Sequence, residues 1–119
     1  MTPQKFEQID QAIENYKALK LKVAITELDL TIGAGGGQLG GGGRGRGSTP
    51  ASAESLQAQA EAYGKLFAIF LKHQDIINRV TFWGLNDRRS WRSGQNPLIF
   101  DSENKAKPAL QAIMSVAVR

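Results

Sequence analysis

Two acidic residues stand close together in an otherwise apolar stretch, KVAITELDL, at residues 22–30. The stretch is typical of a β-strand, and because side chains alternate along a strand, Glu27 and Asp29 should share one face, which would also carry Val23 and Ile25. Charged carboxylates are costly to bury without partners. In parallel α/β folds, active sites form at the carboxyl ends of the strands, so both acids are candidates for catalysis. The alternative is an edge strand whose acids meet water or pair with an arginine.

Two tryptophans follow the end of a second predicted strand, in the stretch TFWGLNDRRSW at residues 81–91. Trp83 would close the strand, and Trp91 would lie in the loop after it. Aromatic faces pack against the C–H surfaces of pyranose rings, so this pair predicts a sugar platform. The alternative is that both tryptophans are core or interface residues.

Taken together, these stretches and the later PLIFDSENKAKPAL resemble the C-terminal end of a glycoside hydrolase family 10 xylanase. The resemblance covers nearly the whole chain apart from a glycine-rich segment. It implies a (β/α)8 TIM barrel that cleaves internal bonds of β-1,4-xylan with retention of configuration. Residues 1–119 would form its C-terminal segment, from about helix 6 to helix 8. No cofactor is implied.

The resemblance also assigns roles to the two acids. Glu27, in TELD, matches the family's catalytic nucleophile. Asp29 matches the acid that supports the nucleophile through a histidine on the preceding strand. A retaining enzyme needs a second carboxyl group about 5–5.5 Å from the nucleophile.

In the second motif, Trp83 and Trp91 match aromatic residues of the sugar subsites nearest the cleaved bond. Asp87 matches an acid that we expect to hold the loop. The variable positions between them are expected to edge the subsites; they are Asn86, Arg88 and Arg89.

Half of the expected catalytic pair falls outside this chain. The family's acid/base glutamate follows an asparagine at the end of strand four, and the supporting histidine precedes the chain's first residue. The sequence has one histidine, His73, which we expect to be a surface or helix-terminus residue without a catalytic role. We therefore predict that the chain alone is inactive and needs a complementary N-terminal barrel fragment as a partner.

The predicted elements alternate between helix and strand, which favours parallel strands joined by helical crossovers. Thr2 is expected to cap the first helix, and Lys20 stands where a glycine would end it better. Residues 33–50 are glycine-rich and read as a flexible loop. The expected helices cover residues 2–19, 52–72 and 108–118, the strands 22–30 and 77–85, and an irregular stretch 86–107. Two parallel strands do not close a sheet, and a complete barrel takes about 250 residues, so this α/β fold is incomplete.

Two other functions remain open. A net charge of +4 and the GRGRG segment would suit a nucleic-acid-binding module, although the basic residues are scattered. The other alternative is a non-catalytic structural fragment of the same barrel. The chain has no cysteine and one histidine, which argues against a metal cluster. No apolar run approaches the roughly 20 residues of a membrane helix. MTPQKFEQID has no apolar signal core, so a secreted location is inferred from the substrate alone.

Overall fold

The computed structural model describes residues 1–32 and 51–118, in which helices and strands alternate as predicted. The predicted glycine-rich loop at 33–50 lies outside the described residues. The elements in chain order are α1 (Pro3–Ala18), β1 (Val23–Leu28), α2 (Ala53–Lys72), β2 (Ile77–Phe82) and α3 (Pro108–Ala117). None of these helices is long and apolar enough to cross a membrane.

The observed helix ends test the local sequence signals for where a helix starts and stops. Pro3 occupies the first turn of α1, and Thr2 stands at the N-cap position as predicted, but its side chain makes no capping hydrogen bond. At α2, Ser52 accepts a hydrogen bond from the Ser55 backbone N–H at 3.1 Å and caps the helix. Lys20, the residue after the C-cap of α1, has φ 58°, the left-handed conformation that glycine adopts most easily.

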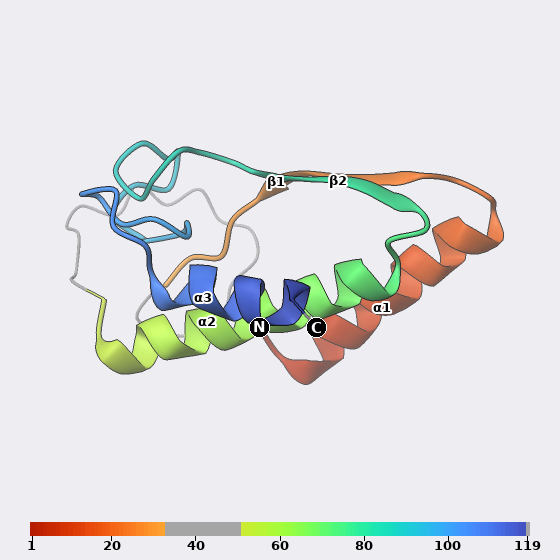
Figure 1. Ribbon diagram of the computed structural model, residues 1–119, viewed down its shortest axis with the longest axis horizontal. Helices are drawn as coiled ribbons and strands as arrows, with labels where there is room; N and C mark the ends of the chain where they lie inside the picture. The colour runs from red at the N-terminus through yellow and green to blue at the C-terminus, as the bar shows by residue number, and fades with distance from the viewer. Residues whose placement is uncertain (33–50, 119) are drawn as a thin grey trace.

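The two strands form a parallel pair, as predicted, with Val23 opposite Ile77 and Leu28 opposite Phe82. α2 connects them, which makes a βαβ unit. All three helices lie on the same side of the pair, and α3 runs beside α2 (Figure 1). No helix of the described residues covers the other side (Figure 1).

The side chains of β1 do not alternate strictly. Val23 and Ile25 are partly buried and pack against the core, whereas Glu27 is exposed. The pairing register shifts between Ile25 and Leu28, so that Leu28 is buried on the helix side instead. The prediction that Glu27 shares a face with Val23 and Ile25 is therefore wrong, because an irregularity in a strand resets which side its residues face.

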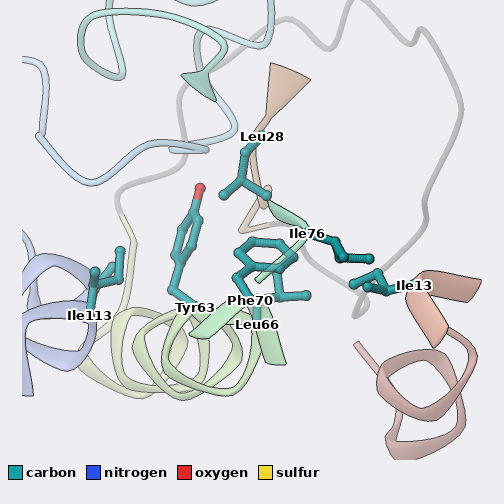
Figure 2. Close-up of a cluster of buried hydrophobic side chains, with 8 residues drawn as sticks. Ile13, Leu28, Tyr63, Leu66, Phe70, Ile76 and Ile113 are labelled. Atoms are coloured by element: carbon teal, nitrogen blue, oxygen red, sulfur yellow. The ribbon is translucent and has the colours of Figure 1, made fainter. Parts of the chain in front are cut away.

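The core lies between the sheet and the helices, with Tyr63, Leu66 and Phe70 standing on α2 (Figure 2). Leu28 reaches this cluster from β1, and Ile13 reaches it from α1 (Figure 2). Full burial of one such side chain stabilises the fold by about 1.5–3 kcal/mol. The core thus fixes the end of β1, where the candidate site begins.

The segment after β2 is irregular, as predicted, but it is held by backbone hydrogen bonds. Phe100 and Ala106 form an isolated antiparallel bridge. Two further bonds tie the segment to the chain after β1: the Leu30 N–H donates to the Pro97 carbonyl at 3.0 Å, and the Ile32 N–H to that of Gln95 at 2.8 Å. The continuations of both strands therefore lie together at their carboxyl ends.

Candidate functional site

Glu27 lies next to the last residue of β1, at the carboxyl end of the parallel pair. Its side chain is exposed, and it has no hydrogen-bond or ion-pair partner among residues 1–32 and 51–118. The carboxylate therefore faces solvent, where a substrate or another part of a larger protein can reach it.

Asp29 follows two residues later, and its side chain is only 10% exposed. It accepts a hydrogen bond from the Trp91 indole Nε1 at 2.7 Å. Its other oxygen lies 3.6 Å from the Arg92 Nε. The structure thus pairs the second acid with a tryptophan and an arginine of the loop, while the first acid remains exposed. The arginine pairing that was the alternative for these acids is observed at Asp29.

The two tryptophans lie at the same end of the sheet and are exposed. Trp83 is 46% exposed and Trp91 62%. The Trp83 backbone N–H donates to the Leu28 carbonyl at 3.1 Å, which places Trp83 beside the end of β1. The Arg92 guanidinium lies 4.4 Å from the centre of the Trp91 ring, within the range of a cation–π contact. Within the described residues, neither tryptophan is a core residue.

Asn86 and Asp87 are buried inside the loop rather than exposed at its surface. The Asn86 side-chain oxygen accepts a bond from the Arg89 N–H at 2.8 Å, and its amide nitrogen donates to Asn104 at 2.6 Å. Both ends of this amide are engaged within the loop. Arg88 and Arg89, by contrast, are exposed.

The Asp87 carboxylate bridges two parts of the loop. One oxygen accepts a hydrogen bond from the Leu98 N–H at 2.7 Å, and the other from the Lys107 Nζ at 2.9 Å. The Asp87 and Lys107 side chains are 3% and 4% exposed, so this ion pair is buried. Burial lowers the pKa of Lys107, and the Asp87 carboxylate opposes that shift.

Lys107 is a structural residue that the sequence analysis missed. Its Nζ also donates to the Asn96 carbonyl at 2.8 Å, so one ammonium ties residue 96 to Asp87 just before α3 begins. Lysine is almost never fully buried unless it is paired. In the sequence it stands in NKAKPAL among other lysines, and no local signal distinguishes it from them.

Gln59 and Tyr63 of α2 bind the backbone of the segments that follow β1 and β2. The Tyr63 hydroxyl donates to the Pro97 carbonyl at 2.6 Å and accepts from the Leu30 N–H at 3.1 Å. The Gln59 Nε2 donates to the carbonyls of Leu30 and Asn96, both at 2.7 Å. Burial raises the pKa of Tyr63, which therefore stays a neutral donor. The four-residue spacing of Gln59 and Tyr63, which places them on one helix face, was the sequence signal that could have predicted this shared role.

A second polar cluster lies at the opposite, amino-terminal end of the strands. His73 caps the C-terminus of α2 but is 1% exposed, so the expectation that it lies at a helix terminus is confirmed and a surface position is wrong. Its Nε2 lies 2.5 Å from an Asp10 oxygen, and its Nδ1 lies 3.6 Å from Glu14. The hydrogen bonds of Lys72 and then His73 lower the pKa of Asp10.

Asp10, Glu14 and His73 bring potential metal-ligand atoms within 4.8 Å of one another, a grouping that the residue counts did not predict. The two acids approach different nitrogens of the imidazole ring. In addition, Lys72 donates to both oxygens of Asp10, at 3.0 and 2.7 Å. An imidazole presents one nitrogen to a given metal ion, and an ammonium already neutralises Asp10, so the contacts favour an ionic link between α1 and α2.

Comparison with known proteins gives consistent matches along the chain. The family model described as glycosyl hydrolase family 10 matches residues 1–116. Endo-1,4-beta-xylanase A of Caldicellulosiruptor saccharolyticus is 34% identical over 113 residues, which are 89% of this chain and 31% of that protein. An endo-1,4-beta-xylanase/feruloyl esterase of Xylanibacter ruminicola is 52% identical over 56 residues, which are 46% of this chain and 8% of that protein.

Solved structures match the fold as well. A GH10 xylanase from termite gut that contains a bacterial Ig-like domain superposes with a TM-score of 0.82 at 34% identity, over 95% of this chain and 26% of that one. TsXylA, an intracellular xylanase from Thermoanaerobacterium saccharolyticum, gives 0.73 at 33% identity, over 91% and 29%. The chain thus spans about a third or less of the length of these four proteins.

Proposed function

The chain belongs to glycosyl hydrolase family 10, and we propose that it forms the C-terminal part of a barrel that hydrolyses internal β-1,4 bonds of xylan. The family fold is a TIM barrel, of which the described residues hold three helices and two parallel strands. On this proposal they correspond to about helix 6 to helix 8. The expected family resemblance is confirmed by the family match and by the xylanase relatives.

A complementary N-terminal barrel segment is the partner that this proposal requires. The parallel pair is covered by helices on one side only within the described residues (Figure 1). A closed barrel takes eight such strands and about 250 residues. Burial of the open side and of the unpaired strand edges would drive association of the two parts.

We assign Glu27 as the nucleophile of a retaining mechanism. Its carboxylate would attack the anomeric carbon while an acid from the complementary part protonates the departing glycosidic oxygen. Water, deprotonated by that same second residue, would then release the sugar and restore Glu27. The observation that carries this assignment is the exposed carboxylate of Glu27 at the carboxyl end of a parallel strand, beside Trp83.

The remaining positions divide into sugar contacts and loop supports. Trp83 and Trp91 are exposed and would stack on xylose rings. Arg88 and Arg89 are exposed and would edge the subsites. Asp87 would hold the loop, which its bonds to Leu98 and Lys107 support.

The geometry changes our proposal for Asn86 and adds contacts to the supporting role of Asp29. Asn86 was expected to edge a sugar subsite, but it is buried and its amide is engaged, so we now propose that it holds the loop. Asp29 would support the active site from beside the nucleophile. Among the described residues, its side chain contacts Trp91 and Arg92.

By itself the chain would be inactive, because the acid/base residue belongs to the missing part. A secreted location for the assembled enzyme follows only from the extracellular polymer it would cleave. TsXylA, an intracellular xylanase, shows that a similar protein need not be secreted.

The test is hydrolysis of an aryl β-xylobioside by the chain alone, by the chain mixed with a fragment that carries strands one to six of the family fold, and by the same mixture with Glu27→Ala. We expect activity in the wild-type mixture alone, with the first product formed as the β-anomer by NMR. Glu7→Ala, an exposed acid of α1, is the matched control and should leave the rate unchanged.

Equal rates with and without Glu27 in a folded mixture would overturn the catalytic assignment. No activity in a folded mixture would favour the non-catalytic fragment. Binding that weakens steeply with salt would instead favour the nucleic-acid alternative.

A further inference from the structure

Trp91 is an exposed aromatic side chain that is nevertheless held at two places. It is 62% exposed, yet its indole N–H donates to the Asp29 carboxylate at 2.7 Å. The Arg92 guanidinium lies 4.4 Å from the centre of its ring. An exposed tryptophan without such contacts would sample several rotamers. The two contacts fix the ring plane, and the large exposed fraction shows that much of the ring surface stays accessible.

The two residues that hold Trp91 are themselves secured. The Asp29 side chain is 10% exposed and the Arg92 side chain 16%. Arg92 Nε lies 3.6 Å from the second Asp29 oxygen, and it is buried without a hydrogen-bond partner within residues 1–32 and 51–118. The carboxylate therefore faces the indole N–H with one oxygen and the guanidinium with the other. Each of the three side chains contacts the other two.

This arrangement links two strands through side chains. Asp29 follows β1, two residues after Glu27, whereas Trp91 and Arg92 belong to the loop after β2. A bond to a charged acceptor is shorter and stronger than one between neutral groups. The position of the Trp91 ring is thereby set relative to the strand that carries Glu27.

We propose that Asp29 and Arg92 are positioning residues that hold Trp91 as a platform for the C–H face of a β-linked xylose ring. The part of this inference that names the sugar rests on the proposed function, whereas the clamp itself rests on the contacts above. Arg92 acquires a role that neither the motifs nor the resemblance gave it. Asp29 acts on the sugar platform as well as beside the nucleophile.

The clamp is tested on the full ¹⁵N-labelled chain by NMR of its two indole N–H signals. Trp83→Phe and Trp91→Phe assign the signals, since the chain has two tryptophans. Asp29→Asn keeps the shape of the acceptor but removes its charge. We expect the Trp91 signal to move upfield and its N–H to exchange with water about tenfold faster or more. The Trp83 signal should stay in place and report that the fold is intact.

Two further variants separate the contacts of Trp91. Arg92→Met keeps a long side chain without charge and should increase quenching of Trp91 fluorescence by acrylamide in a Trp83→Phe background. Arg92→Lys should restore part of the protection, because an ammonium can also lie over the ring. Glu103→Gln, a change at an exposed loop acid, is the matched control and should alter neither readout. An unchanged Trp91 signal in Asp29→Asn, with the Trp83 signal in place, would overturn the clamp.

Xylotriose then tests the ligand in the mixture with the complementary barrel fragment. We expect it to shift the Trp91 signal, and we expect Arg92→Met to raise KM by several-fold more than it lowers kcat. If Asp29→Asn moves the Trp91 signal but xylotriose moves neither indole signal, the clamp stands and the sugar ligand is overturned. Loss of the nucleophile role is detected separately, by Glu27→Ala in the same mixture.

Discussion

Each end of the parallel strands contains a cluster of polar and charged side chains, but the two clusters bind different partners: one binds main-chain groups, and the other connects two helices. At the carboxyl ends, the Asp87–Lys107 pair binds main-chain groups of the irregular segment. At the amino ends, His73 and Lys72 bind Asp10 and connect one helix to another. The first arrangement leaves Trp83 and Trp91 exposed on a fixed loop, whereas the second joins two helices.

The difference shows that buried polar side chains help ligand binding when they hold a loop that carries the binding residues. A loop without regular secondary structure must satisfy its backbone groups by other means, and here buried side chains do so. A helix satisfies its own backbone, so a polar contact between α1 and α2 adds only to their docking. α1 docks through the buried Ile13, with Phe6 and Ile9 packed partly buried against the same core, and the ionic link adds to these apolar contacts.

The largest expected effect tests the buried Asp87–Lys107 pair at the carboxyl ends of the strands. Lys107→Met leaves the Asp87 carboxylate buried without its cation, and we expect a loss of about 3–5 kcal/mol in the free energy of unfolding. Urea unfolding followed by circular dichroism measures it. The double variant Asp87→Asn/Lys107→Met should recover part of the loss, because no unpaired charge remains. A loss below about 1 kcal/mol for the single variant would show that the pair does not organise the loop.

The next effect concerns the turn that leads from β2 into the loop. Gly84 has φ +138°, and a Cβ there would lie 2.8 Å from the Leu98 Cδ1 and 3.0 Å from the Arg89 carbonyl oxygen. Gly84→Ala should therefore destabilise the chain by about 2–4 kcal/mol through strain and crowding.

Gly64→Ala is the matched control for Gly84→Ala. Its Cβ would meet Ala112 at an ordinary 3.6 Å, and alanine in a helix interior is favoured by about 0.5–1 kcal/mol. Equal losses for the two variants, measured by thermal unfolding, would contradict the special geometry of Gly84.

A smaller effect tests the link between α1 and α2 at the amino ends of the strands, through its dependence on pH. The pKa of Asp10 is lowered from 3.8 by Lys72 and His73. A carboxyl group with a lowered folded-state pKa contributes stability above its unfolded pKa, and that stability is lost as pH falls through the folded value. We expect Asp10→Asn to lower stability at pH 7 by roughly 1 kcal/mol or less and to reduce the loss between pH 4 and 2.

Urea midpoints at several pH values measure this difference. Glu7→Gln, on the same helix, should keep the wild-type profile. The indole N–H signal of Trp91 should not move in Asp10→Asn. If it moved, the two ends would be coupled, and the comparison between them would fail.

The smallest effect is a gain in stability. Lys20 adopts φ 58°, and the bonds from its N–H to the Lys17 carbonyl and from the Leu21 N–H to that of Tyr16 are those of a Schellman motif. Lys20→Gly should raise the free energy of unfolding by about 0.5–1 kcal/mol, because glycine takes this conformation without strain. Lys22→Gly, at a position outside the left-handed region, should not stabilise the chain. A loss on Lys20→Gly would contradict the assigned helix end.

Local patterns were sufficient for the elements of this fold. Hydrophobic periodicity, Pro3, Ser52 and Pro108 predicted three helices whose ends agree with the structure to within one residue. Alternation of helix and strand predicted the parallel pair. These signals act within one turn or one strand, so a single sequence contains them.

Long-range contacts were not available from the same patterns. The register shift in β1 moved Leu28 to the core side, which strict alternation does not predict. Buried Asn86 and Lys107 have the residue types of surface positions, and their partners are 18 and 20 residues away in the chain.

By itself, the sequence determined the helices, the strands, their parallel order and the placement of Glu27, Asp29 and the two tryptophans near strand ends. Only the tertiary structure decided that Asp29 faces Trp91 and Arg92, that Glu27 stays exposed and that His73 is buried. The physical reason is that periodicity depends on neighbours a few residues apart, whereas burial and ionic pairing depend on which distant segments the folded chain brings into contact.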